Sequence, residues 1–131
     1  MATLLKPLQW IYCLYAFVTF TAIMFLIFPL VFLASFYGRI RGGNMIHWLI
    51  RRWADGWFFL IGIRARRIYE APHDPSASYI FVSNHISYLD AAIVPKAFRQ
   101  KIRPLGKAEM SRVPVFGFIY RNAIVTVDRS S

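Results

Sequence analysis

The first third of the chain is one long apolar stretch. No Asp, Glu, Lys or Arg occurs in the 32 residues between Lys6 and Arg39. A helix of that length measures about 48 Å, whereas the hydrocarbon core of a bilayer is about 30 Å thick. Pro29 separates two apolar pieces, residues 10–28 and 30–37, and predicts a kink between them. Because basic residues follow instead of a small-residue cleavage site, we expect a membrane anchor and not a signal peptide.

Residues 44–63 have the pattern of an amphipathic helix. One face carries charged side chains and the other is apolar. The apolar face consists of Ile46, Leu49, Ile50, Trp53 and Trp57, and the polar face of Arg51, Arg52 and Asp55. Trp and Arg together suit the lipid headgroup layer, and the helix directly follows the anchor, so an interfacial position is favoured over a soluble core. We therefore expect residues 1–67 to form a membrane anchor and an interfacial helix.

After Arg67 the pattern becomes that of an α/β domain, residues 68–131. A loop with two prolines, residues 71–77, marks the boundary. Apolar runs predict strands at 78–83 and 124–127, and a strand or extended segment at 101–105. The segments between them predict short helices at 88–98, 107–112 and 115–120. The strand at 78–83 is expected to be buried, because its centre is continuously apolar. Strands alternating with short helices imply βα units packed in layers.

Composition strengthens the expectation that a membrane is the partner. Hydrophobic residues make up 57% of the chain and charged residues 17%, whereas an ordinary soluble domain has about a quarter charged residues. This balance argues against a free cytosolic protein and against intrinsic disorder. The net charge of +10 points first to anionic lipid and second to nucleic acid. No recognisable nucleic-acid-binding module is present, so no nucleic-acid partner is expected.

The distribution of charge predicts an orientation. Residues 39–67 contain seven Arg and one Asp, while only Lys6 precedes the apolar stretch. If the anchor spans, its C-terminal side lies in the cytoplasm, which predicts a location in the cytoplasmic or inner membrane. Spanning and looping back into one leaflet both stay open. The single cysteine, Cys13, excludes an internal disulfide, and no Cys/His cluster has zinc-ligand spacing, so no metal site is expected.

The segment most informative about chemistry is Asn84-His85-Ile86-Ser87-Tyr88-Leu89-Asp90, where the strand at 78–83 gives way to a helix. Side chains at the carboxyl end of such a strand face the ligand crevice of an α/β layer. Asp90 in the first helical turn can accept from one imidazole nitrogen of His85, leaving the other to take a proton from a nucleophile that the substrate supplies. Two plainer interpretations stay open: Ser87 and Asp90 match a helix capping box, and His85 can be a hydrogen-bonded turn histidine.

Together with residues 106–129, this segment resembles the 1-acyl-sn-glycerol-3-phosphate acyltransferase family, the phospholipid/glycerol acyltransferases. The first family motif is NHxxxxD, present here as Asn84, His85 and Asp90. The second block aligns through Lys107-x-Glu109-Met110, then Pro114 and Gly117, then Val127-Asp128-Arg129. The two motifs occur in the family's order behind a hydrophobic N-terminal anchor. In the family a third motif of the Glu-Gly-Thr-Arg type follows, whereas this sequence stops at Ser131.

The resemblance implies the first part of a layered βα acyltransferase domain, with the C-terminal part missing and the fragment alone weakly active or inactive. It implies that His85 is a general base oriented by Asp90. The acceptor implied is a lysophospholipid, 1-acyl-glycerol-3-phosphate in phospholipid synthesis. The donor is acyl-CoA or acyl-carrier protein, and no cofactor is needed. The alternatives are an acyltransferase for another hydroxylated lipid, or a basic membrane-anchored protein without activity that binds anionic lipid or a partner.

The family assigns acceptor binding to its second block. On matching positions the candidates for the acceptor phosphate are Lys107 and Arg129, while Gly117 allows close backbone approach and Asn84 belongs to the first motif. Plainer interpretations carry equal weight for the two cations. Arg129 can form an exposed pair with Asp128, and Lys107 can be a solvated side chain.

Overall fold

The computed structural model describes residues 2–71, 74, 76–84, 87, 89–98 and 100–128, with side chains from Lys6 onward. It begins with helix α1 (Ala2–Ser35), which contains both Pro7 and Pro29. The two apolar pieces predicted on either side of Pro29 are thus parts of one helix. Within the described chain, Lys6–Ser35 is the one helix long and apolar enough to cross a membrane. That property makes α1 a candidate anchor.

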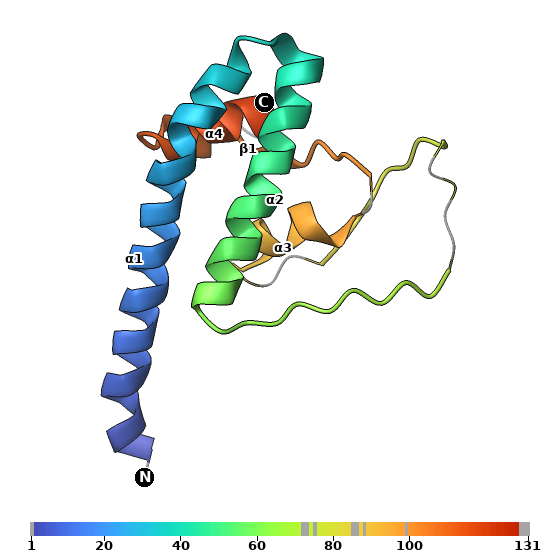
Figure 1. Ribbon diagram of the computed structural model, residues 1–131. Coiled ribbons are helices and arrows are strands. Elements are labelled where there is room, and N and C mark those ends of the chain that lie inside the picture. Colours follow the sequence, from blue (N-terminus) through green and yellow to red (C-terminus); the bar gives the residue numbers. More distant parts are fainter. Residues whose placement is uncertain are drawn as a thin grey trace.

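A short π-helical turn, η1 (Gly38–Gly42), reverses the chain into α2 (Gly43–Leu60). The two long helices lie side by side as a hairpin, and α2 lies between α1 and α3 (Figure 1). Indole groups of α2 cross the seam: Trp57 Nε1 donates to the carbonyl of Ala16 at 2.8 Å, and Trp53 Nε1 to that of Phe20 at 3.4 Å. The predicted amphipathic helix is therefore confirmed.

The apolar face of α2 is covered by protein. Ile46, Leu49, Trp53 and Trp57 are all buried, and the ring of Phe20 meets Trp53 edge-on with the centroids 4.6 Å apart. These side chains thus contact α1 and the rest of the chain, as the core helix of a soluble domain would. An interfacial position of the hairpin stays a prediction, and it cannot rest on the two buried indoles.

The second half contains α3 (Asp90–Ala97), β1 (Leu105–Lys107), the 3-10 helix η2 (Ala108–Arg112), α4 (Phe116–Ala123) and β2 (Val125–Val127). The two strands pair in parallel, with Leu105 opposite Val125 and Lys107 opposite Val127. Because η2 and α4 connect them, β1 to β2 is one βα unit, as the alternating pattern predicts. The predicted helices at 88–98, 107–112 and 115–120 and the strand at 124–127 are confirmed, with ends shifted by a few residues.

The strand expected at 101–105 lies later in the chain, at Leu105–Lys107. Proline explains the shift, because Pro104 has no backbone N–H to donate to a ladder. Its carbonyl still accepts from Val125 N at 2.9 Å, so the pairing begins there and continues forward.

The buried strand predicted at 78–83 is wrong in this structure. The segment is irregular, and Ile80 and Val82 are 95% and 92% exposed. Alternate side chains point elsewhere: the rings of Tyr79 and Phe81 lie 5.8 Å apart, and Phe81 lies 4.1 Å from Phe98. Residues 78–83 thus have the alternating side chains of a strand but no hydrogen-bonded partner strand. In the described chain β1 pairs with β2, and no strand pairs with residues 78–83. The fold is thus rich in helix, with a small parallel sheet.

Two apolar clusters meet on α2 and hold the molecule together. One joins α1, the first half of α2 and α4, and consists of Met24, Val31, Ala34, Ile46, Leu49 and Ile119. The other joins α2 to α3 and consists of Trp53, Ala54, Trp57, Phe58, Ile61 and Ala92. Helix α3 begins with Asp90, the Asp of the first motif, and its packing against α2 sets its position.

Candidate active site

Asp90 is the first residue of α3, and its carboxylate closes the turn before the helix. Asp90 Oδ2 accepts from the backbone N–H of Ser87 at 3.0 Å, and Ser87 Oγ accepts from the N–H of Leu89 at 3.1 Å. The first bond is one half of a capping box, and a carboxylate is also favoured beside a helix N-terminus. The second bond goes to Leu89 N–H and not to Asp90 N–H, and Leu89, the N-cap of α3, makes no side-chain capping bond. The capping interpretation of Ser87 and Asp90 is thus confirmed only in part, in the turn before the helix. His85 lies outside the described residues, so the dyad stays a prediction.

The other candidate residues lie on different elements of the second half. Asn84 is exposed at the end of the irregular segment, and Lys107 is the exposed last residue of β1. Lys107 is paired in register with Val127, the last residue of β2. Parallel strands end at one edge of a sheet, so residues that follow β2 are expected near Lys107. Arg129 follows two positions after Val127 and lies outside the described residues.

Gly117 is buried in the first turn of α4, where it permits a close approach within the chain. A Cβ at this position would overlap the carbonyl of Ser111 in η2, and Gly117 N donates to the carbonyl of Val113 at 2.6 Å. Its lack of a side chain is therefore needed for packing α4 on η2. A role toward the acceptor stays a prediction.

A family model described as Acyltransferase matches residues 64–131, just over half of the chain. The matched range contains the first motif, the βα unit and the second block. The chain belongs to the acyltransferase family. The resemblance drawn from the motifs is thus confirmed at the level of the family. No curated protein and no solved structure matches this acyltransferase at a significant level.

One close contact beside the second block escapes sequence reasoning. Gly106, in the middle of β1, faces the side chain of Tyr120, and a Cβ on Gly106 would overlap the tyrosine hydroxyl. Tyr120 is buried, and its pKa is raised chiefly by burial and further by the carboxylate of Glu109. The acyltransferase therefore holds a neutral phenol against the strand that carries Lys107. The signal available was a glycine inside a strand, which often marks a close approach.

A second unforeseen feature lies near the start of α2. His47 is buried, and its Nε2 has no partner among the described residues. The pKa of His47 is lowered, first by burial and then by the positive charges of Arg51, Arg103 and Lys101. Arg103 reaches this end of the helix by donating to Asn44 Oδ1 at 3.1 Å. Burial and these charges therefore favour the neutral imidazole. The ring lies close to the point where the second half of the chain meets the hairpin of α1 and α2.

The described residues bring no three His, Cys, Asp or Glu side chains together as a metal site. What the described site offers is a carboxylate fixed at the start of α3 and a cation at the end of β1. Direct proton transfer and binding of an anionic group are the chemistry that such side chains support.

Proposed function

We propose that this acyltransferase moves a fatty acyl group from acyl-CoA or acyl-carrier protein to the free hydroxyl of a lysophospholipid, 1-acyl-glycerol-3-phosphate, in phospholipid synthesis. The observation that carries the proposal is the Asn84-His85-x-x-x-x-Asp90 motif, within the family match and with its Asp at the start of α3. Both reactants are substrates, and the reaction needs no cofactor.

His85 takes the proton of the acceptor hydroxyl while the oxygen attacks the carbonyl carbon of the donor thioester. Asp90 accepts from the other imidazole nitrogen and favours the imidazolium that forms. The tetrahedral intermediate then collapses: the carbon–sulfur bond breaks, the thiolate leaves, and the imidazolium returns its proton to the sulfur. The products are an ester and a free thiol. No enzyme nucleophile takes part, which agrees with a sequence whose single cysteine, Cys13, lies in α1.

Lys107 and Arg129 bind the acceptor phosphate in this proposal, with Asn84 and Gly117 as further acceptor-side residues. The pairing of Lys107 with Val127 supports it, because residues that follow β2 are expected at the edge of the sheet where Lys107 lies. Two cations on one phosphate form charge-assisted hydrogen bonds, each worth about 1.5–3 kcal/mol.

The proposed location is the cytoplasmic face of the cytoplasmic or inner membrane. The face of α1 that α2 leaves uncovered is strongly apolar: Phe17, Phe25, Leu26 and Leu33 are each more than half exposed. An apolar surface of this kind is typical of a lipid contact, and the seven Arg of residues 39–67 favour the side with anionic headgroups. Membrane lipid, acceptor and donor are thus the proposed partners, without nucleic acid.

Acyl transfer by membranes that contain the full-length protein tests the proposal. We expect a labelled acyl group to pass to lysophosphatidate, from acyl-CoA or from acyl-carrier protein, and we expect His85→Ala to abolish the transfer. Arg129→Ala and Lys107→Ala should raise KM about tenfold for lysophosphatidate and little for an acylated amino acid. Membrane binding without transfer to any acceptor would favour the basic lipid-binding alternative. Transfer to a phosphate-free acceptor alone would identify an acyltransferase of different specificity.

A further inference from the structure

Helix α3 is too short to set its own position. It has eight residues, contains Pro95, and begins at Asp90. Isolated helices shorter than about 12–15 residues are marginal in water, so tertiary contacts must hold α3 in place. The contacts that orient α3 therefore also decide where the Asp90 carboxylate lies.

One face of α3 is docked on α2. Ala92 is completely buried in the cluster formed with Trp53 and Phe58, and Leu89 packs against the same cluster. Lys96 follows Ala92 by four positions and so lies on the same face. Asp90 is offset from Ala92 by two positions and thus lies on another side of the helix. Docking through this face leaves the carboxylate directed away from α2.

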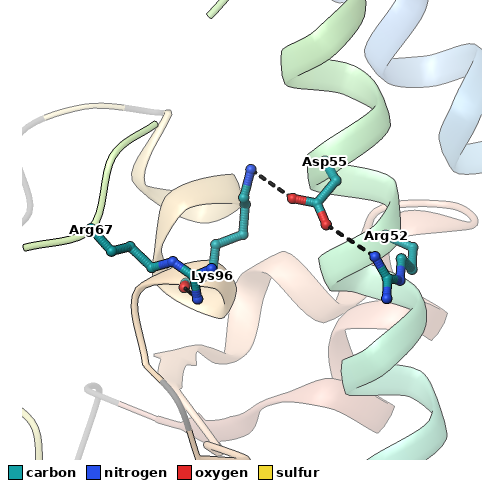
Figure 2. A network of polar contacts seen from close by, with 4 residues as sticks. All are labelled: Arg52, Asp55, Arg67 and Lys96. Carbon is teal, nitrogen blue, oxygen red and sulfur yellow. Dashed lines mark hydrogen bonds and ion pairs between the residues drawn. The ribbon is translucent and has the colours of Figure 1, made fainter. Parts of the chain in front are cut away.

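The directional contact on the docked face is an ion pair. Lys96 Nζ lies 2.7 Å from Asp55 Oδ1 (Figure 2). The same ammonium lies 4.7 Å from the centroid of the Phe58 ring. Apolar contacts such as those of Ala92 are non-directional and permit rotation, whereas a short ion pair restricts it. The Lys96 side chain is 16% exposed and that of Asp55 is 47% exposed. The pair is thus half-buried, and its ammonium is the more buried partner.

Asp55 has a second, weaker partner that provides a control. Arg52 Nη1 lies 3.8 Å from Asp55 Oδ2, and the Arg52 side chain is 65% exposed. Figure 2 shows Asp55 between the two cations, with Arg52 on its own helix and Lys96 on α3. An exposed pair within one helix contributes little and fixes nothing outside that helix. The two cations thus share one carboxylate but differ in what they connect.

The end of α3 is also fastened. Arg67 Nη1 donates to the carbonyl of Lys96 at 3.0 Å, and Tyr69 OH donates to that of Ala97 at 2.9 Å. These are carbonyls that a helix C-terminus leaves without intrahelical partners. The turn formed by Ser87 and Asp90 holds the other end. The ion pair between Lys96 and Asp55 adds a directional contact on the face of α3 that packs against α2.

We propose that Asp55 and Lys96 are positioning residues for catalysis: their ion pair sets the orientation of α3 on α2, and so places Asp90 against the general base. The inference rests on the proposed function, because it acts through the dyad. Catalytic groups tolerate little displacement, since a misplacement of about 1 Å can cost on the order of 10²-fold in rate. Neither residue belongs to the two family motifs, and they lie 41 positions apart in the chain.

The experiment compares Lys96→Met with Arg52→Gln in the full-length protein in membranes. Both substitutions remove one positive charge, and methionine keeps the apolar stem of Lys96, so α3 stays covered. We expect kcat of Lys96→Met to fall about tenfold or more, with both KM values little changed, while Arg52→Gln stays close to the wild type. Asp55→Asn should match Lys96→Met, and the double variant should lose little more, because the contact between Lys96 and Asp55 is lost in each case and the exposed pair with Arg52 contributes little.

The pH profile separates positioning from general loosening. A well-placed Asp90 raises the pKa of the base, so its displacement should move the acidic limb of kcat/KM to lower pH in Lys96→Met and not in Arg52→Gln. The exchange of Asp55→Lys with Lys96→Asp should restore part of kcat and of the pH profile. A fall in kcat with an unmoved acidic limb would overturn the inference.

Failure of the proposed function gives a different result. Wild-type membranes without acyl transfer, or an active His85→Ala enzyme, would overturn the function and the positioning role together. An active wild type and an inactive His85→Ala variant, with equal kcat for Lys96→Met and Arg52→Gln, would overturn the positioning role alone.

Discussion

The helical hairpin and the motif-bearing half of the molecule are held together in different ways. The hairpin is closed by side chains that reach across a long apolar seam, such as Tyr12 OH, which donates to the carbonyl of Ile61 at 2.8 Å. In the part of the motif-bearing half that the structure describes, the helices have eight residues or fewer and the two strands have three residues each. Its apolar Ile80 and Val82 remain exposed. The hairpin is thus the frame, and the motifs are carried by elements that depend on it.

This difference separates stability from chemistry. Substitutions in the seam of the hairpin should change the free energy of unfolding, and through it everything attached to α2. Substitutions of polar motif residues should change the rate of acyl transfer and leave the frame intact. The following predictions test this separation, from the largest expected effect to the smallest.

The largest effect is expected at Asp90, where capping and catalysis can be distinguished. Asp90→Asn retains an oxygen that can accept from Ser87 N–H, but it lacks the charge that favours the imidazolium of the base. We expect kcat to fall on the order of 10²-fold while the unfolding temperature stays near that of the wild type. Asp90→Ala should lose the cap as well, at a cost of about 1 kcal/mol. Wild-type kcat in Asp90→Asn would reduce Asp90 to a capping residue.

An effect of similar size, here on the free energy of unfolding, is expected for a substitution in the apolar seam between α1 and α2. Trp57 is 6% exposed and bonds Ala16, so Trp57→Ala should lower the free energy of unfolding by about 3–5 kcal/mol. Trp48 on the same helix is 55% exposed, and Trp48→Ala should change it by less than about 0.5 kcal/mol. Denaturation in detergent, followed by circular dichroism, measures both. Equal losses would mean that the seam does not hold the frame.

The same contrast explains what could be predicted from the sequence. A helix forms its backbone hydrogen bonds within itself, so local periodicity was sufficient for α2 and for the short helices of the second half. A strand needs a partner elsewhere in the chain. The apolar run at 78–83 therefore resembles a buried strand in sequence but has no partner strand among the described residues. The run at 124–127, in contrast, forms β2 and pairs with β1.

Contacts between distant residues were not predictable for a related reason. Periodicity showed that Trp53 and Trp57 share an apolar face, but not that α1 would cover it. The charge pattern placed Asp55 on a polar face, but not opposite Lys96, which lies in a different predicted element. For the candidate site, the roles of the motif residues stay predictions, and the structure adds the contacts that hold Asp90 and Lys107 in place.

A smaller effect is expected at the contact between β1 and α4. A methyl group at Gly106 would overlap the hydroxyl of Tyr120, so Gly106→Ala should lower the free energy of unfolding by about 1–3 kcal/mol, as overpacking commonly does. Tyr120→Phe removes the overlapped oxygen. The double variant should therefore recover part of the loss, which chemical denaturation can measure. Additive losses would show that the two residues do not meet.

The smallest effect is expected from the titration of His47, where the two regions meet. Its folded-state pKa lies below the ordinary value of 6.5, chiefly because the ring is buried. Below pH 6.5 the unfolded chain therefore binds a proton at His47 that the folded chain does not bind. As a result, the free energy of unfolding declines as the pH falls toward the folded-state pKa. His47→Leu removes this term, so its stability should depend less on pH over that window. Parallel pH dependence in wild type and His47→Leu would mean that the imidazole is protonated equally in the folded and unfolded chain.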